Sequence, residues 1–285
     1  MTTNPSNNNT YLFDPESPTE MARLINQDRY LTKVMGGPLS GIDDLASLHT
    51  ILDLGCGPGG WALDVAFEQP HTRVTGVDIS STMINYANAR ASTQNLTNVS
   101  FGIKDITRPL KISDASFDLV NARLLMAVLR REAWPTLLAE GYRVLRPGGI
   151  IRLTEMVDVV TTSPAFEKQW ALLYRLLYLG GYGFSATGTT IGIATVLPLL
   201  LRQAGFTQVR HLSHVQDFSM GSESWMDGYR NQEVLNVTMS PLFVKAGLIS
   251  QEEIDTLNQH VLIERNAEDF CGMGYFHTVF AVKPA

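Results

Sequence analysis

A glycine-rich loop and the acidic residues around it are the parts of this 285-residue sequence whose types and spacing suggest chemistry. Residues 51–60 read ILDLGCGPGG, so an apolar strand enters a loop of small residues and continues as a helix at about Trp61. Because glycine has no Cβ, such a loop lets the backbone approach a ligand at the carboxyl end of a sheet. An ordinary tight turn is the structural alternative, but four glycines in six residues favour a ligand-binding loop.

Three aspartates near this loop indicate the charge of the ligand. The G-x-G-x-x-G spacing also matches a dinucleotide-binding loop, and Asp78 follows at about the separation expected of a carboxylate that holds ribose hydroxyls. Asp53 precedes the glycines, where it would repel a pyrophosphate but stabilise an ammonium or sulfonium group. Asp105 adds an acceptor suited to an adenine amino group. The set therefore favours a positively charged nucleoside over a dinucleotide.

Each of these carboxylates also has a structural interpretation. Asp53 could orient the loop by accepting backbone N–H groups, and Asp78 and Asp105 could cap helices or turns. Their positions after three successive strand-like runs favour a shared site.

Alternating strand-like and helical patterns must position these residues. Apolar runs predict strands at 50–54, 73–78, 98–103, 117–121 and 149–155, with helices between them that include 80–91 and 132–145. This alternation is typical of βαβ units and a parallel sheet. Further along, the patterns predict helices at 165–182 and 192–204, a strand at 206–213, a helical region at 222–268 and a closing, hairpin-like edge strand at 275–282.

The same patterns predict how the chain is divided. We expect a disordered or loosely docked tail, a helical arm, a ligand-binding core, and a remainder of the core that carries two helical lid insertions. The corresponding residues are 1–18, 19–45, 46–160 and 161–285, with the insertions at 162–190 and 218–268.

The motifs between residues 50 and 155 together resemble the class I S-adenosylmethionine (SAM) dependent methyltransferases. They are LDLGCGPGG, VTGVDIS, the KDI of 104–106, FDLVNARLLMAV from Phe117 and LRPGGIIRLTE from Leu145. They follow the order and spacing of that family. The resemblance implies an α/β, Rossmann-like, doubly wound and mostly parallel sheet of about seven strands, the last of them antiparallel.

The resemblance also implies a set of residues that bind SAM. Gly55 to Gly57 would border its methionine part, and Asp78 would bind both ribose hydroxyls. Asn121 would lie beside the sulfonium through its backbone. The full set expected around the cofactor is Tyr30, Asp53, Gly55, Cys56, Gly57, Asp78, Ile79, Met83, Asp105, Ile106 and Asn121.

Positioning an acceptor opposite an electrophilic methyl group is the main task of such an enzyme, so a catalytic base is optional. The candidate bases are Glu155, His211 and His214. The two histidines are three residues apart on one strand and therefore point to opposite faces. Acidic clusters with metal-ligand spacing are not evident, and we expect no metal.

Aromatic residues beyond the core indicate what kind of molecule accepts the methyl group. Trp170, Tyr174, Tyr178 and Tyr182 recur at four-residue steps, and a second group contains Trp225, Met226 and Tyr229. Such a stripe most often packs in a core, but its place after the fifth strand suggests a lid over the cofactor. We therefore expect an apolar or aromatic small-molecule substrate, of the kind found in secondary metabolism.

Composition narrows the partners and the setting. The net charge of −6 comes without a run of basic residues, so nucleic acid is not expected. The longest apolar stretch, 191–201, is too short for a membrane span, and the beginning of the sequence does not resemble a signal peptide. With two cysteines, a cytoplasmic location is favoured. A homo-oligomer is left open, as are two other functions: a SAM-binding protein that catalyses a non-methylating reaction, and an NAD-dependent oxidoreductase.

Overall fold

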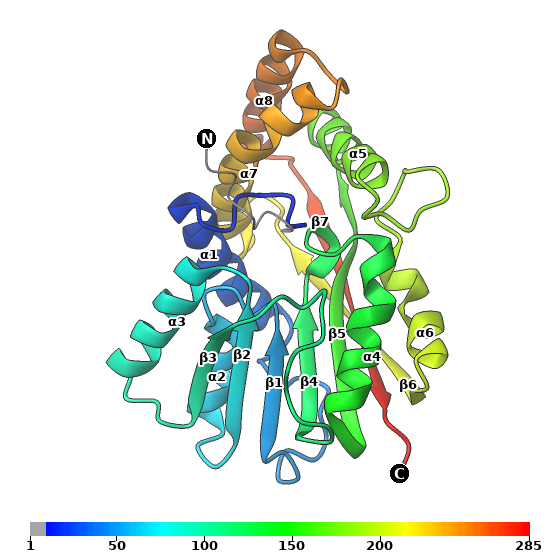
Figure 1. Ribbon diagram of the computed structural model, residues 1–285. Helices are drawn as coiled ribbons and strands as arrows, with labels where there is room; N and C mark the ends of the chain where they lie inside the picture. Colours follow the sequence, from blue (N-terminus) through cyan, green and yellow to red (C-terminus); the bar gives the residue numbers. More distant parts are fainter. Residues whose placement is uncertain (1–9) are drawn as a thin grey trace, which may run out of the picture.

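A seven-stranded sheet with helices on both faces forms the body of the molecule (Figure 1). The computed structural model describes residues 10–285. The strand order is β3-β2-β1-β4-β5-β7-β6. The strands are β1 (Thr50–Leu54), β2 (Arg73–Asp78), β3 (Val99–Ile103), β4 (Phe117–Arg123), β5 (Leu145–Thr161), β6 (Thr207–Asp217) and β7 (Gly272–Val282).

The first five strands run parallel, as the βαβ alternation predicts. All five residues of β1 are buried, because the strand has parallel neighbours on both sides and helices cover both faces. The chain winds outward from β1 to β3 and then returns to β4 on the other side. This reversal opens a crevice outside the carboxyl ends of β1 and β4, where α/β proteins bind their ligands.

The far half of the sheet confirms the antiparallel last strand but places it differently from the prediction. β7 pairs antiparallel with both β5 and β6, so β7 lies inside the sheet and β6 forms the edge. β5 is also longer than the predicted 149–155, since it pairs with β7 as far as Thr161.

Helices connect the strands and extend beyond them. They are α1 (Pro18–Val34), α2 (Gly60–Glu68), α3 (Ser81–Thr93), α4 (Trp134–Val144), α5 (Pro164–Leu179), α6 (Ile193–Gln203), α7 (Trp225–Lys245) and α8 (Gln251–Arg265), with short 3₁₀ turns η1 (Leu125–Ala127) and η2 (Arg131–Ala133). Figure 1 shows α5, α7 and α8 gathered beyond the carboxyl ends of the strands. The region predicted as helical at 222–268 contains two helices, because the chain turns at Gly247 with a φ of +67°.

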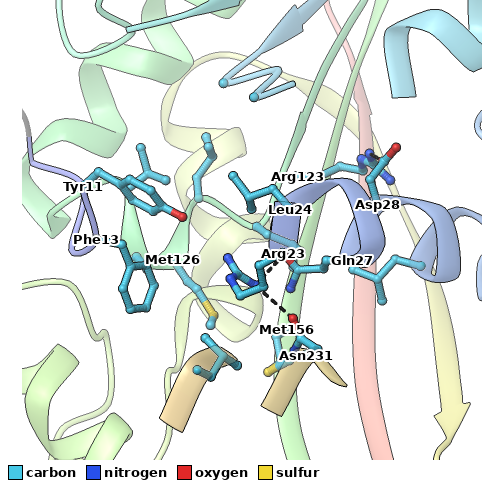
Figure 2. Close-up of a pocket in the computed structure, with 18 of the residues that line it drawn as sticks. Tyr11, Phe13, Arg23, Leu24, Gln27, Asp28, Arg123, Met126, Met156 and Asn231 are labelled. Atoms are coloured by element: carbon cyan, nitrogen blue, oxygen red, sulfur yellow. Dashed lines mark hydrogen bonds and ion pairs between the residues drawn. The ribbon is translucent and has the colours of Figure 1, made fainter. Parts of the chain in front are cut away.

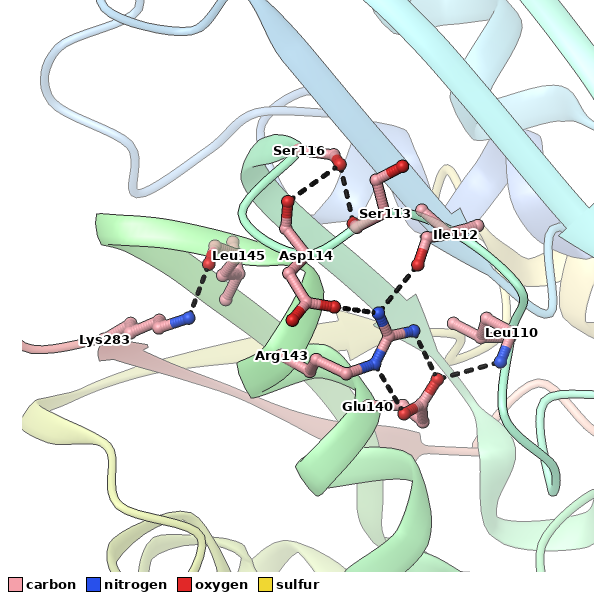
Figure 3. A network of polar contacts seen from close by, with 9 residues as sticks. All are labelled: Leu110, Ile112, Ser113, Asp114, Ser116, Glu140, Arg143, Leu145 and Lys283. Atoms are coloured by element: carbon pink, nitrogen blue, oxygen red, sulfur yellow. Dashed lines mark hydrogen bonds and ion pairs between the residues drawn. The ribbon is translucent and has the colours of Figure 1, made fainter.

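A polar network fastens α4 to the chain that leads into β4 (Figure 3). The guanidinium of Arg143 binds both carboxylate oxygens of Glu140 at 2.8 and 2.9 Å and donates to the Ile112 carbonyl at 2.7 Å. Glu140 in turn accepts the backbone N–H of Leu110 at 2.8 Å. These bonds anchor the segment that follows Asp105.

Residues 10–17 differ from the loosely docked tail that we expected over 1–18, of which residues 1–9 lie outside the described residues. The Glu16 carboxylate accepts the backbone N–H groups of Ser81 and Thr82, both at 3.1 Å, at the start of α3. The backbone N–H of Leu12 donates to the Ala127 carbonyl at 2.9 Å. We call residues 10–17 the N-terminal strap, because these bonds hold them across the carboxyl end of the sheet.

Within residues 10–285, no helix combines the length and apolar character needed to cross a bilayer.

Candidate active site

A cavity opens at the crevice between the carboxyl ends of β1 and β4. Its empty volume is about 1920 Å³, including its open mouth. The glycine loop, the N-terminal strap, α1, α5 and α7 all contribute to its walls.

The structure brings most of the predicted cofactor residues together in this one cavity. Ten of the eleven line it: Tyr30, Asp53, Gly55, Cys56, Gly57, Asp78, Ile79, Met83, Asp105 and Ile106. The three carboxylates therefore share a cleft, as a cationic nucleoside would require.

The glycine loop is shaped both by the cavity and by the protein around it. Gly57 has a φ of +53°, and a Cβ there would have Leu24 as its nearest neighbour at 3.9 Å, so the loop leaves open space on this side. At Gly60, a Cβ would lie 1.8 Å from a carboxylate oxygen of Asp28. Gly60 lines the cavity, and its lack of a Cβ leaves room there for the Asp28 side chain of α1.

Asp78 ties the glycine loop to α3. Its two carboxylate oxygens accept the backbone N–H groups of Gly57 and Ser80, each at 2.9 Å. Burial raises the pKa of Asp78, whereas these hydrogen bonds lower it. A carboxylate has about four acceptor positions, so two remain for the hydroxyls of a ribose.

Asp53 is held by a buried side chain and not by backbone N–H groups. Its carboxylate accepts from the Asn121 amide at 2.7 Å, and the Asn121 carbonyl oxygen accepts from Arg152 at 2.8 Å. Burial raises the pKa of Asp53 to about 7. A cation placed in the cavity would favour the ionised form.

Asn121 is the one predicted cofactor residue outside the cavity lining. We expected it to end its strand beside the sulfonium, but β4 continues to Arg123 and Asn121 lies fully buried behind Asp53. Its role in the structure is to orient Asp53.

Asp105 combines a turn role with its place in the cavity. One carboxylate oxygen accepts from the backbone and hydroxyl of Thr107, at 2.9 and 2.6 Å, and the other lies 3.1 Å from Nε of Arg108. Ile106 beside it is buried.

Charged residues of α1 form a wall of the cavity that the sequence analysis missed. Figure 2 shows Arg23 reaching toward Asn231 of α7, to which it donates at 3.1 Å. Arg23 also binds both carboxylate oxygens of Glu20, at 2.6 and 2.8 Å. Asp28 pairs with Arg123 from the end of β4. Helical periodicity gave no signal for these pairs, since charged residues on a helix usually face solvent.

Comparison with known proteins agrees with this geometry. A methyltransferase domain family matches residues 51–149. A demethylmenaquinone methyltransferase of Lactiplantibacillus plantarum is 30% identical over 190 residues, covering 62% of this chain and 77% of that protein. The chain belongs to the class I SAM-dependent methyltransferases. Methyltransferase pytC of Aspergillus terreus is 24% identical over 246 residues, which cover 82% of this chain and 71% of that protein.

A solved structure supports the fold of this methyltransferase. Phosphoethanolamine N-methyltransferase 2 of Haemonchus contortus, in complex with SAM, superimposes with a TM-score of 0.55 at 20% identity. The match covers 95% of this chain and 57% of that one, so this chain spans little more than half of that protein's length.

The three candidate bases of this methyltransferase lie away from the cavity lining. Glu155 is buried, and its carboxylate accepts the backbone N–H groups of Leu125 and Met126 at 2.7 and 3.2 Å. It therefore positions a turn whose residues do line the cavity. Burial raises the pKa of Glu155 to about 8.

The two histidines of β6 face opposite sides, as their spacing predicts. His211 is exposed, with Nδ1 2.8 Å from Nε2 of His277, whereas His214 is buried and lies 3.2 Å from the hydroxyl of Thr278. Neither contributes to the cavity lining. All three candidate bases thus lie outside the cavity lining, and their role as bases stays a prediction.

Apolar residues of α5, α7, β5 and the segment after β6 line the other end of the cavity. They include Met156, Phe166, Trp170, Leu173, Phe218, Leu235 and Met239. Of the predicted aromatic stripe only Trp170 takes part. Tyr174 donates to Asp158, and Tyr182 follows the end of α5 and donates to the Thr10 carbonyl.

Among the described residues, no group of three or more His, Cys, Asp and Glu side chains is arranged to hold a metal ion. Metal independence stays a prediction.

Proposed function

We propose that this methyltransferase transfers the methyl group of SAM to an oxygen, nitrogen or carbon atom of an apolar or aromatic small molecule of secondary metabolism. One observation carries the proposal: a single cavity joins a carboxylate-lined end to an end lined by aromatic and methionine side chains. The cofactor site fits SAM, because Asp53, Asp78 and Asp105 supply acceptors for a cationic nucleoside and Gly57 leaves space beside the loop.

SAM supplies an electrophilic methyl group when bound, so the residues of this chain mainly bind and orient. We infer that Asp78 accepts from the ribose hydroxyls, that Asp105 and Ile106 contact the adenine edge, and that Asp53 favours the positive charge of the methionine part. The lid helices hold the acceptor and exclude water.

The two alternative functions are not favoured. A dinucleotide-binding fold continues with a second βαβ half, whereas here an antiparallel β7 enters between β5 and β6. A non-methylating SAM-binding protein would share this cavity, but the matching family and the relatives described above are methyltransferases.

Incubation with SAM and an extract containing apolar metabolites tests the proposal. We expect S-adenosylhomocysteine (SAH) to accumulate and one metabolite to gain the mass of a methyl group. If calorimetry detects binding of neither SAM nor SAH, the proposal is wrong.

Several further features belong to this proposal. Cys56 and Cys271 are free thiols, which supports a reducing, cytoplasmic setting. We propose that the insertions at 162–190 and 218–268 act as the lid. A homo-oligomer and the lack of a nucleic-acid partner stay predictions.

A further inference from the structure

Arg265, the last residue of α8, is 1% exposed and lines the end of the cavity where we place the methyl acceptor. Four aromatic rings surround its guanidinium, with centroids 4.9 to 5.7 Å from Cζ: Phe166, Phe218, Tyr229 and Phe270. These rings come from three different parts of the chain, so the cage depends on the assembled lid.

The charge of Arg265 lacks a counter-ion in the part of the chain that the structure describes. Its Nη1 makes one long hydrogen bond to the Gly228 carbonyl, at 3.3 Å, and its buried Nε makes none. Glu233 of α7 acts on it at longer range and does not form an ion pair. Arg23, which lines the same cavity, binds both carboxylate oxygens of Glu20.

A buried guanidinium without a carboxylate is costly, because desolvation is balanced only in part by attraction to aromatic faces. Burial lowers the pKa of Arg265 to about 10, so the group stays charged at neutral pH. Its planar fork of N–H donors matches the oxygens of a carboxylate or phosphate. Gly228 leaves one edge of the guanidinium uncovered, since a Cβ there would stand 3.5 Å from Nη2.

We propose that Arg265 binds an anionic group of the methyl acceptor, a carboxylate or a phosphate, at the lid end of the cavity. The apolar remainder of the acceptor then lies along the aromatic and methionine wall toward the cofactor. This inference rests on the proposed function and adds a charge requirement to it: the substrate is amphipathic.

Calorimetry on the whole protein saturated with SAH tests the charge requirement with three probes of equal chain length: octanoate, octyl phosphate and octanamide. We expect at least one anion to bind about tenfold or more tightly than octanamide, because a charge-assisted pair replaces a neutral contact. The tighter of the two anions identifies the group as carboxylate or phosphate. Absence of any preference for an anion, including absence of binding by all three probes, overturns the proposal.

Variants of Arg265 test whether the residue binds an anionic group or only supports the structure. Arg265→Met should remove the anion preference and leave the melting temperature unchanged or higher, since it removes a buried unpaired charge. Arg265→Lys should retain part of the preference. Arg175→Met removes an exposed charge of α5 outside the cavity lining and serves as the matched control.

Affinity for SAH distinguishes the inference from the proposed function. We expect the Kd for SAH to be the same in all these variants. A weaker Kd in Arg265→Met would assign Arg265 to the carboxylate of the cofactor and overturn the acceptor role. If the native protein does not bind SAH, the proposed function itself fails.

Discussion

Single residues carry most of the chemistry proposed here, and Asp53 is the clearest case. The residue is 4% exposed, and its carboxylate receives one hydrogen bond, from Asn121. Burial therefore raises its pKa to about 7, and the residue is poised to lose a proton when a cation binds.

SAM binding should therefore depend on pH through Asp53. Below pH 7 Asp53 is increasingly protonated in the free protein. We therefore expect the affinity for SAM to decrease between pH 7 and 5.5, with a slope that approaches a tenfold loss for each pH unit. Calorimetry in buffers of different ionisation enthalpy would also detect the released proton. Asp53→Asn should bind more weakly at pH 8 but with a flat profile. Equal slopes in both proteins would contradict this role.

Asp78→Ala should weaken SAM binding by tenfold or more, because hydrogen bonds from the ribose to a charged acceptor contribute about 1.5–3 kcal/mol each. Asp118→Ala is the control, since Asp118 also accepts backbone N–H groups, those of His49 and Thr50 at 2.9 and 2.8 Å, outside the cavity lining. The control should lose stability and keep its affinity. A normal Kd in Asp78→Ala would show that the ribose is placed wrongly.

Among the structural elements, the N-terminal strap is the one whose part in the site differs most from the sequence prediction. Tyr11, Phe13 and Pro15 line the cavity, and Glu16 bonds to the start of α3, 65 and 66 positions further along the chain. Hydrogen bonds from Thr82 and its neighbours lower the pKa of Glu16 although burial would raise it.

Weakening this bond should open the cofactor end of the cavity. A lost helix cap costs about 1 kcal/mol, so Glu16→Ala should raise the dissociation rate of SAM about fivefold and speed hydrogen exchange at Ser81 and Thr82. Stopped-flow and exchange measurements would show both effects. Asp44→Ala, which loses the acceptor of a surface turn at Ser47, is the matched control. An unchanged dissociation rate would mean that the strap does not retain the cofactor.

Strands and the strap illustrate what local patterns can predict. The five parallel strands were predicted within a few residues at most ends, because strands buried on both faces leave apolar runs between glycine and proline breakers. The strap has no such pattern. Its position depends on Glu16 meeting a helix terminus, which no local periodicity reports.

The whole molecule couples its stability to pH through Glu155. Its folded-state pKa is about 8 against an ordinary value of 4.5, so the folded protein holds a proton that the unfolded chain releases. The stability that this proton contributes is therefore complete below about pH 4.5 and is lost as pH rises to about 8.

Denaturant unfolding between pH 5 and 9 measures this coupling. Because glutamine stays neutral, as protonated Glu155 does, we expect the native protein to lose a few kcal/mol of unfolding free energy relative to Glu155→Gln between pH 5 and 8.5. Asp53 also has a raised pKa, so the difference between the two proteins is the relevant quantity. A constant difference across this range would contradict the titration of Glu155.

Residue order alone was enough to predict the βαβ alternation, the glycine loop and the carboxylates that follow successive strands, because parallel strands bring their carboxyl ends to one edge. Ten predicted cofactor residues consequently share a cavity. The residues at the end of the cavity where we place the methyl acceptor could be identified only from the tertiary structure. Arg23, Arg265 and the N-terminal strap meet the site through contacts between segments far apart in sequence. A periodic pattern identifies the buried face of a helix but not the distant partner that covers it.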